Sequence, residues 1–397
     1  MRPLLLTHVG VVSCLGAGQA ETLRQLRRGE SGLRPCDFEG AALETHIGRV
    51  TGLETAPILG VRAPYDCRNH RLAQRALERD GFVDAVIRAR GQYGAHRIGV
   101  FAGTSTAGIL ESEQAFRRRD PDSGALPPEF RYREQHNTYS IADFLQQTFA
   151  LTGPALVVSA ACASTAKVFG VAARMIALDL CDAAIVGGAD SLCLTTLYGF
   201  NALQLTSTRP CRPFDVARDG ISIGEAAGFV LVERDEPNAR GANIRLLGVG
   251  ESSDAYHMSS PHPDGLGARQ AMQAALSSAG LGPQAIDYIN IHGTATKAGD
   301  LAEDHAVSTL FGRDTPCTST KGLTGHTLGA SGVLEVILSM LALRHAFIPA
   351  SPTTQNLDPE LRSRYLQAGQ DLPLTHVMTN SFGFGGSNCS LILGRTG

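Results

Sequence analysis

Apolar and polar positions along the chain follow two alternating patterns. Short, nearly uninterrupted apolar runs, typical of strands buried on both faces, alternate with longer stretches whose apolar residues recur at helical spacing. This alternation predicts an α/β fold with largely parallel central sheets. The runs expected to form buried strands are RIGVFAG, ALVVSAA, DAAIVGGA, GFVLVER, IDYINIHG, CTSTKG and HVMTNSFG.

The first apolar run has two readings. It resembles a secretion signal, because one arginine precedes an apolar stretch and small residues follow it. His8 interrupts that stretch, so we expect a buried strand over residues 4–12 instead. Gly16 and Gly18 then turn the chain into a helix that begins near Glu21. No later segment has the roughly 20 uninterrupted apolar residues of a membrane span, and none is expected.

A weak internal symmetry relates two parts of the chain. In the first part an apolar run leads into Cys162 and then into an apparent helix over 164–179. In the second part another run leads into His292, and a helix follows over 300–311. Open α/β sheets bind ligands at the carboxyl ends of their strands, so we expect each part to deliver a reactive side chain to one site.

The boundary between these parts is expected where the apolar pattern breaks, over residues 234–243. The prediction is an N-terminal half, 1–238, and a C-terminal half, 239–397, that together form one compact unit. The least regular stretch, 117–137, is rich in proline and charge and is expected to lie on the surface.

Composition narrows the class of protein. The 397 residues, 43% of them hydrophobic, suffice for a large core. A formal net charge of −3 gives no general basic surplus for binding nucleic acid. Nine cysteines are scattered without a CxxC pair or a Cys/His cluster at metal-ligand spacing. This usage favours a reducing, cytoplasmic location and predicts no metal site.

One cysteine is distinguished by its position. Cys162 lies where an apolar strand meets the start of a helix. Free N–H groups at such a junction favour a thiolate and can lower a cysteine pKa from about 8.5 toward about 7. Cys162 is therefore a candidate nucleophile, although a small buried core residue is the commoner role of a free cysteine. The other eight cysteines lack such a junction and are expected in the core.

Two histidines follow later strand ends. His292 is followed by glycine and two threonines, and His326, five residues after Lys321, is flanked by glycines that allow close approach of a ligand. A lone histidine at a strand end is more often a structural group. One cysteine and two histidines on separate loops, however, supply the nucleophile and the oxyanion donors that thioester chemistry needs.

Two glycine-rich segments are candidates for loops beside a site. The segment 381–388, SFGFGGSN, lacks the lysine and the downstream helix of a phosphate-binding P-loop. Its phenylalanines, Phe382 and Phe384, suit an apolar gate. The segment 218–228, RDGISIGEAAG, leads directly into a predicted strand, and both a flexible loop and a plain tight turn fit it.

These blocks resemble the signatures of the β-ketoacyl-[acyl-carrier-protein] synthases of types I and II. The resemblance spans nearly the whole chain and departs from the usual pattern at His8 and Cys14. It implies a thiolase fold, in which two similar halves with mixed five-stranded sheets form a five-layer αβαβα sandwich, and assembly as a dimer. The blocks that carry it are ACAS, RDGISIGEAAG, HGTAT with Asp300 eight residues on, STKGLTGHTLGASG and NSFGFGGSN.

The resemblance also implies catalytic roles. Cys162 would accept the acyl group. His292 and His326 would assist the loss of carbon dioxide from a malonyl thioester and stabilise the enolate that attacks the acyl-Cys thioester. Lys321 would be the motif lysine of the family, and Glu335 its ion-pair partner.

Further residues would complete the site. The backbone N–H groups of Cys162 and Phe384 would form the oxyanion hole, with Phe384 also gating the acyl pocket. Thr106, Ile109 and Phe382 are the other residues expected to shape that pocket.

The implied partner is an acidic acyl carrier protein, whose phosphopantetheine arm carries the substrates. No tightly bound cofactor is expected. A basic patch would dock this partner by charge-steered contact, although solvated helix faces could carry the same arginines. The candidates are Arg68, Arg71, Arg117, Arg118 and Arg119.

Several alternatives stand beside this interpretation. Starter-type synthases of the third kind pair their cysteine with His and Asn, whereas both positions are His here. Degradative thiolases lack HGTAT and use a second cysteine near the C-terminus, and Cys389 lies in another context. A non-catalytic chain-length partner typically lacks the nucleophile, but this chain could be the catalytic half of a heterodimer with one. The favoured pathway is fatty-acid elongation, and the alternative is a specialised polyketide or aryl-polyene pathway.

Overall fold

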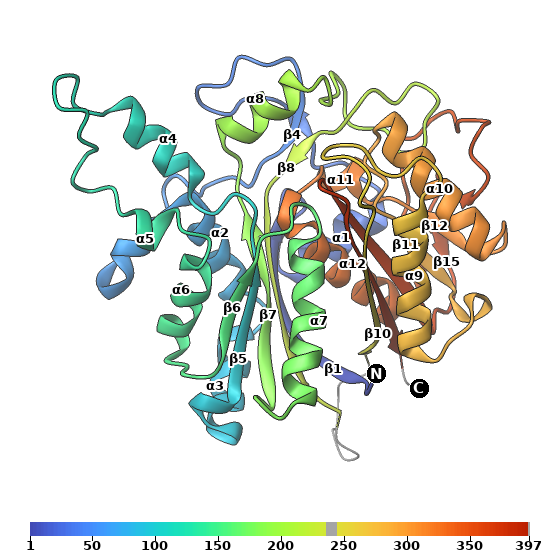
Figure 1. Ribbon diagram of the computed structural model, residues 1–397, viewed down its shortest axis with the longest axis horizontal. Coiled ribbons are helices and arrows are strands. Elements are labelled where there is room, and N and C mark those ends of the chain that lie inside the picture. The colour runs from blue at the N-terminus through green and yellow to red at the C-terminus, as the bar shows by residue number, and fades with distance from the viewer. Residues whose placement is uncertain (236–243, 396–397) are drawn as a thin grey trace.

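The computed structural model describes residues 1–235 and 244–395, so the boundary expected between 238 and 239 lies outside the described residues. One mixed sheet crosses the whole molecule (Figure 1). On one side its strands are, in order, β6 (Ala155–Val158), β5 (Ile98–Gly103), β7 (Ala183–Asp190), β9 (Ala226–Arg234) and β1 (Leu4–Ser13), with β2 (Gly16–Ala17) beside β1. On the other side they are β10 (Ile244–Ser253), β17 (Ser387–Arg395), β16 (His376–Gly383), β11 (Tyr288–Asn290), β12 (Pro316–Thr318) and β14 (Arg364–Tyr365).

The two sides of the sheet share one pairing pattern. β6, β5 and β7 are parallel, and β9 and β1 then add antiparallel pairs. β12, β11 and β16 are likewise parallel, and β17 and β10 add antiparallel pairs. The prediction of two similar mixed five-stranded sheets is confirmed. The sheets are not separate, however, because Leu4 of β1 pairs with Arg234 on one side and with Leu246 on the other.

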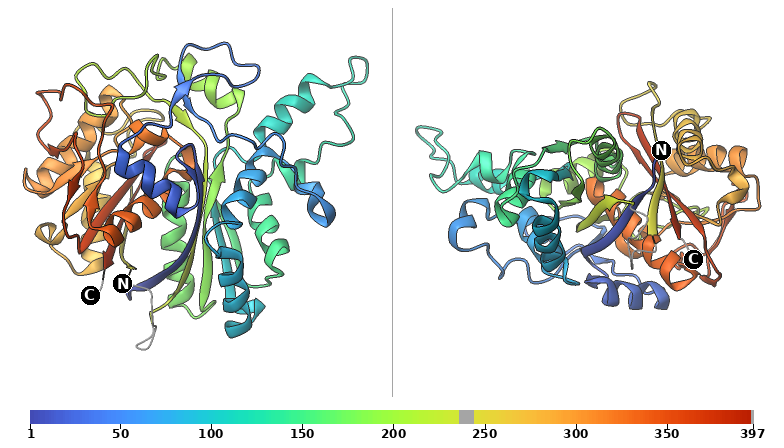
Figure 2. Two further views of the ribbon diagram at one scale, coloured as in Figure 1. Left: turned by 180° about the vertical axis from the view of Figure 1, so that it is seen from behind. Right: turned by 90° about the horizontal axis from the view of Figure 1, so that it is seen from below.

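Helices cover both outer faces and fill the space between the sheets (Figure 2). The outer helices of the first side are α2 (Arg68–Leu77), α3 (Phe82–Tyr93) and α6 (Ser140–Phe149), and those of the second side are α9 (Leu266–Ala279) and α10 (Lys297–Phe311). Two central helices, α7 (Ser164–Ala177) and α12 (Ser331–His345), contact each other and strands of both sheets. This is the five-layer arrangement of the thiolase fold.

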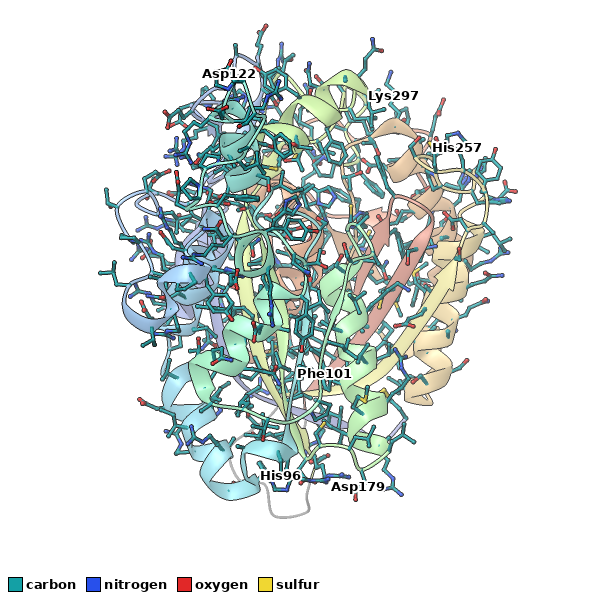
Figure 3. All side chains as sticks on the ribbon, turned by 60° about the vertical axis from the view of Figure 1, so that its left-hand side comes forward. His96, Phe101, Asp122, Asp179, His257 and Lys297 are labelled. Atoms are coloured by element: carbon teal, nitrogen blue, oxygen red, sulfur yellow. The ribbon has the colours of Figure 1, made fainter. Side chains whose placement is uncertain are left out.

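The remaining elements are short or lie at the periphery. The first helix begins at Gln19, two residues before the expected Glu21. The stretch 117–137 is mostly exposed, as expected, and Asp122 projects from its outer loop (Figure 3). The short or peripheral elements are α1 (Gln19–Arg28), α4 (Ile109–Arg117), α5 (Tyr132–Gln135), α8 (Leu194–Ala202), α11 (Lys321–Thr324), β3 (Arg34–Pro35), β4 (His46–Gly48), β8 (Ile223–Gly224), β13 (Phe347–Ile348), β15 (Gln370–Asp371) and the 3₁₀ turns η1 (Gly60–Tyr65), η2 (Ala95–Arg97), η3 (Pro283–Ala285) and η4 (Leu328–Ala330).

The helix α12 forms the centre of the hydrophobic core. Every residue from Ser331 to Leu343 is buried, as expected for a helix that is apolar all round. The segment Leu328–His345 has the length and composition of a membrane span, but 89% of it is buried inside the protein. It is therefore the core helix of this fold.

The two central helices approach closely because small residues face each other. A Cβ atom added to Gly332 of α12 would lie 2.4 Å from the backbone nitrogen of Ala166 on α7. Real Cβ atoms do not come this near to a backbone nitrogen. Only glycine at position 332 allows the helix that follows Cys162 to pack at this distance from the helix that follows His326.

This contact predicts that Gly332→Ala lowers the free energy of unfolding by about 1–3 kcal/mol, because the extra methyl group overpacks a rigid backbone contact. Urea denaturation of the purified protein measures the change. Gly91→Ala is the matched control, since Gly91 lies within α3 and an added Cβ meets nothing within 4 Å. That variant should be unchanged or stabilised by about 0.5–1 kcal/mol. Equal stability losses in both variants would contradict the packing argument.

Candidate active site

Cys162 lies in a tight connection between β6 and α7. Ala161 just before it has a left-handed backbone, with φ of 46°, and α7 begins two residues after it. The Cys162 side chain is buried, and the nearby backbone N–H of Phe384 acts to lower the pKa of its thiol. The predicted strand-to-helix junction is present, and it presents the thiol to the loop that contains Phe384.

His326 meets Cys162 from the other half of the fold. Its Nε2 lies 3.0 Å from Cys162 Sγ, and its Nδ1 lies 3.0 Å from Ser331 Oγ. The backbone of His326 is fixed as well, because its N–H donates to Ser222 O at 2.7 Å and its carbonyl accepts from Gly224 N at 2.9 Å. The segment RDGISIGEAAG thus holds the His326 loop through these backbone bonds.

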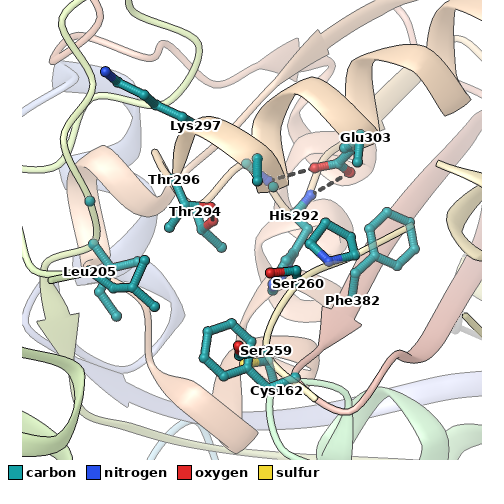
Figure 4. A pocket seen from close by; sticks show the side chains of 18 of the residues that line it. Cys162, Leu205, Ser259, Ser260, His292, Thr294, Thr296, Lys297, Glu303 and Phe382 are labelled. Atoms are coloured by element: carbon teal, nitrogen blue, oxygen red, sulfur yellow. Dashed lines mark hydrogen bonds between the residues drawn. The ribbon is translucent and has the colours of Figure 1, made fainter. Parts of the chain in front are cut away.

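His292 completes the group. Its ring centroid lies 5.2 Å from that of His326. The sulfur of Cys162 and one ring nitrogen from each of His292 and His326 all lie within 4.8 Å of one another. Its backbone N–H donates to Glu303 of α10 at 2.8 Å, and Gly293 N donates to the same carboxylate at 2.7 Å (Figure 4). The sequence places this cysteine and these histidines far apart, and the fold brings them together.

Lys321 and Glu335 form a buried ion pair beside the histidines. Lys321 Nζ contacts Glu335 Oε1, and both side chains are almost fully buried. Burial, with the Lys321 charge as the second cause, holds the pKa of His292 and of His326 well below the ordinary value. Both imidazoles are therefore neutral near pH 7, which is the form that donates a hydrogen bond without a full charge.

The pKa of Cys162 differs from the sequence-based expectation. The helix junction predicted a lowered value, but burial raises the pKa of the thiol to about 11. Desolvation of the thiolate outweighs the groups that lower the pKa, which are the N–H of Phe384, the Lys321 charge and the N–H of Cys162 itself. The resting site thus holds a thiol beside a neutral imidazole rather than an ion pair.

A cavity of about 640 Å³ opens onto these residues. Thr294 and Thr296 lie on its wall, with 3.0 Å between their hydroxyl oxygens, and Lys297 is exposed where α10 begins (Figure 4). The two phenylalanines of the predicted gate, Phe382 and Phe384, both line it. The cavity is large enough for an extended small-molecule arm that reaches Cys162.

Thr106 and Ile109, which were expected to shape the acyl pocket, do not line this cavity. The Thr106 hydroxyl is engaged elsewhere, because it donates to Asp190 at 3.0 Å and accepts from Ser191 N at 3.1 Å. Ile109 is half-buried at the start of α4. Their role in an acyl pocket stays a prediction.

The docking prediction was wrong for Arg68. Its guanidinium is buried and bonds to Glu225, which is fully buried, and to Glu54. Loss of Arg68 would leave the buried Glu225 carboxylate unpaired, so Arg68 is a structural residue. Arg71 is half-buried and tied to Asp66 in the same way. Among the docking candidates, the exposed residues are Arg117, Arg118 and Arg119.

Sequence reasoning missed two residues that hold His292. Glu303 accepts from the His292 and Gly293 backbones, and Asn380 of β16 donates to Glu303 at 3.2 Å. The available signal was the acidic face of the predicted helix 300–311, since Asp300, Glu303 and Asp304 recur at helical spacing and all three are buried.

The thiolase fold and a buried cysteine with two neutral histidines define an acyltransferase that works on thioesters. Comparison with known proteins specifies the class further. The model described as "Beta-ketoacyl synthase, N-terminal domain" matches residues 65–238, and that of the C-terminal domain matches 244–355. The chain belongs to the β-ketoacyl synthase family.

Individual relatives agree with this assignment. The chain is 33% identical over 415 residues to 3-oxoacyl-[acyl-carrier-protein] synthase 2 of Coxiella burnetii, with 99% of each chain covered. It superposes with a TM-score of 0.90 and 37% identity on a chain of the complex of the ketosynthase ApeO and its chain length factor ApeC from Xenorhabdus doucetiae, covering 100% of this chain and 98% of that one. A β-ketoacyl synthase from Burkholderia phymatum gives 0.90 and 30%, with both chains fully covered. The protein is a β-ketoacyl synthase.

The raised pKa of Cys162 predicts how its reactivity depends on pH. Because the thiolate fraction keeps growing until pH reaches the pKa, the rate constant for alkylation by iodoacetamide should rise about tenfold per unit from pH 7 to pH 9. Intact-mass analysis with peptide mapping of Cys162 measures it. Glutathione is the reference, since the rate constant of an ordinary thiol stops rising tenfold per unit as pH passes its pKa of about 8.5. A plateau for Cys162 below pH 8 would indicate a thiolate–imidazolium pair and contradict the neutral resting state.

Proposed function

We propose that Cys162 takes an acyl group from an acyl carrier protein and that His292 and His326 direct its condensation with a malonyl thioester. The observation that carries this proposal is the 3.0 Å contact between Cys162 Sγ and His326 Nε2 inside a buried, cavity-lining group. In the first step the thiol sulfur attacks the acyl carbonyl and loses its proton toward His326. The carrier thiol leaves with a proton, and an acyl-Cys thioester remains.

The second step forms the carbon–carbon bond. The malonyl thioester loses carbon dioxide, and the electron pair of the broken bond becomes an enolate. Neutral His292 and His326 donate hydrogen bonds to its oxygen as the charge develops. The enolate carbon attacks the acyl carbonyl, whose oxyanion is held by the N–H groups of Cys162 and Phe384. The C–S bond to Cys162 then breaks, its electron pair stays on the sulfur, and a proton taken up from solvent restores the thiol. The product is a β-ketoacyl chain two carbons longer.

The Lys321–Glu335 pair has an electrostatic role in this scheme. Burial lowers the pKa of both histidines, and the ammonium of Lys321 lowers it further, so both imidazoles stay neutral. Burial raises the pKa of Glu335 to about 7, and the adjacent Lys321 charge opposes that rise. The pair therefore acts through the histidines, and neither member is a nucleophile.

The remaining features of the proposal concern partners and place in the cell. The cavity and its threonines suit a phosphopantetheine arm on an acyl carrier protein, without a tightly bound cofactor. Arg117, Arg118 and Arg119 are the candidates for docking that carrier. All nine cysteines are free thiols, which suits a reducing, cytoplasmic compartment. The division into halves at 238 and 239 follows the repeated sheet pattern.

Assembly is proposed through the edge of the sheet. β6 is an end strand, and its residues are all only half-buried although they are apolar. A free apolar edge is a template for pairing with another chain. The partner is either a second copy or a chain-length-factor-like homologue.

Two pathways remain as candidate functions. Fatty-acid elongation is the first, supported by the 33% identity to 3-oxoacyl-[acyl-carrier-protein] synthase 2. The second is a specialised polyketide or aryl-polyene pathway, in which this chain is the catalytic half of a heterodimer. The 37% identity to a chain of the ApeO–ApeC complex favours it. A purely non-catalytic chain-length partner is disfavoured, because Cys162, His292 and His326 are all in place.

Acyl loading tests the chemistry. Incubated with acyl-carrier thioesters, the wild type should gain the acyl mass and Cys162→Ala should not. His292→Ala should still load, because only His326 contacts Sγ among the described histidines, but its condensation with malonyl carrier protein should fall by about 10²–10³-fold. Intact-mass analysis follows both steps. Loading of saturated chains favours fatty-acid elongation, and loading of unsaturated or aryl chains alone favours the specialised pathway. Loading of Cys162→Ala would refute the mechanism.

Assembly is tested by light scattering after size-exclusion chromatography. The wild type is expected at twice the chain mass, or at the mass of a heterodimer when a chain-length-factor-like homologue is co-expressed. Val157→Lys places a charge on the β6 edge and should weaken either dimer, since charged edge residues oppose strand pairing. A tight dimer that is indifferent to this substitution would place the interface elsewhere.

A further inference from the structure

Asp190 is a buried carboxylate that the proposed chemistry does not use. It is the last residue of β7 and is fully buried. Within the described chain, no lysine or arginine forms an ion pair with it, and its donors are backbone N–H and hydroxyl groups from two separate segments. Such a group is costly to bury, so its hydrogen bonds have to be well placed.

The carboxylate of Asp190 joins two segments of the chain. Oδ1 accepts from Thr104 Oγ1 at 2.6 Å, Ser105 N at 2.8 Å and Thr106 N at 2.9 Å, which fixes the loop between β5 and α4. Oδ2 accepts from Gly329 N at 2.6 Å and from the Ser105 hydroxyl. Asp190 therefore links the β5–α4 loop to Gly329 of η4, and Gly329 is three residues after His326.

Gly329 is fixed at both of its polar groups. Its N–H donates to Asp190, and its carbonyl accepts from Thr165 Oγ1 at 2.5 Å. Thr165 is three residues after Cys162, on α7. The chain from His326 to Gly329 is short and passes through Leu328, whose φ is 53°. Gly329 is thus a second anchor of the His326 loop, beside the backbone bonds of His326 to Ser222 and Gly224, and it ties this loop to Asp190 and to the Cys162 helix.

The backbone on both sides of Asp190 is held in place by hydrogen bonds. The carbonyl of Ala189 accepts from Asn69 Nδ2 at 2.9 Å. The N–H of Ser191 donates to Thr106 at 3.1 Å, and that of Leu192 donates to Glu225 at 3.0 Å. Backbone groups on both sides of Asp190 are therefore held, and the carboxylate cannot shift without breaking several bonds.

We propose that Asp190 is a positioning residue for acyl transfer, whose Oδ2 bond to Gly329 N sets the contact between His326 and Cys162. This inference rests on the proposed acyl transfer to Cys162. A displacement of His326 by about 1 Å is sufficient to reduce the rate of proton transfer between Cys162 and His326 by about 10²-fold. Asp190 does not line the substrate cavity, and its effect on the geometry of His326 passes through Gly329.

Asp190→Asn tests the contact specifically. The amide oxygen satisfies the donors that face Oδ1, and the NH₂ group then faces Gly329 N–H, so that two donors oppose each other. The rate constant for acyl loading at saturating acyl carrier protein should fall about 10–100-fold, with KM for the carrier unchanged. The Asp190 charge also raises the pKa of Cys162. The iodoacetamide profile of the variant should therefore shift to lower pH, an effect that mere loss of stability does not produce.

Gly329→Ala perturbs the same contact from the other side. Its Cβ would lie 2.7 Å from Asp190 Oδ2 and would push the loop away. It should reproduce the loss in loading rate with unchanged KM. This second variant keeps the inference testable if Asp190→Asn does not fold.

Asp304→Asn is the matched control. Asp304 is equally buried and accepts from Arg362 N, Ser363 N and Ser363 Oγ, the same kinds of donor. It should lose stability in urea denaturation while loading rate per folded molecule and the alkylation profile stay at the wild-type values. Wild-type loading by Asp190→Asn, or equal kinetic losses in Asp304→Asn, would overturn the inference while leaving the proposed function intact. Absence of loading by the wild type would overturn both.

Discussion

The contact between Cys162 and His326 depends on how closely two helices approach. Cys162 precedes α7, His326 precedes α12, and these helices come from different halves of the fold. Gly332 allows α12 to touch the backbone of α7. The sulfur and the imidazole nitrogen then meet at 3.0 Å, without a covalent link or an ion pair between them. Tight packing of apolar helices thus determines the geometry of a polar site.

Burial also determines the protonation states of the site. Desolvation lowers the pKa of both histidines and raises that of the thiol, so each group is neutral at rest. Two neutral imidazoles suit an enolate intermediate, because they donate hydrogen bonds as negative charge appears and do not attract the malonyl carboxylate beforehand. The Lys321–Glu335 pair brings a positive charge close to the histidines together with its counter-charge.

Much of the fold and the central residues of the site could be predicted from the sequence. Buried strands stood out because each is apolar on both faces, and Cys162, His292 and His326 each lie in a short local motif at a strand end. Asp190 could not be found in this way, since it binds Ser105 and Gly329, which lie 85 and 139 residues away in sequence. The prediction that Arg68 docks a carrier protein was wrong because composition does not say which face of a helix packs inward. The prediction of a lowered pKa for Cys162 was wrong because desolvation of the thiolate depends on tertiary burial.

The position of β1 has a consequence for synthesis of the chain. This strand leaves the ribosome well before its two neighbours, because it lies between β9, which begins at Ala226, and β10, which begins at Ile244. More than two hundred further residues are therefore synthesised before the strands that pair with the ten residues of β1 are available. Contacts of such long sequence separation form slowly, and the unpaired strand is open to aggregation in the meantime. The sheet can therefore join its two sides through β1 only after the middle of the chain has been synthesised.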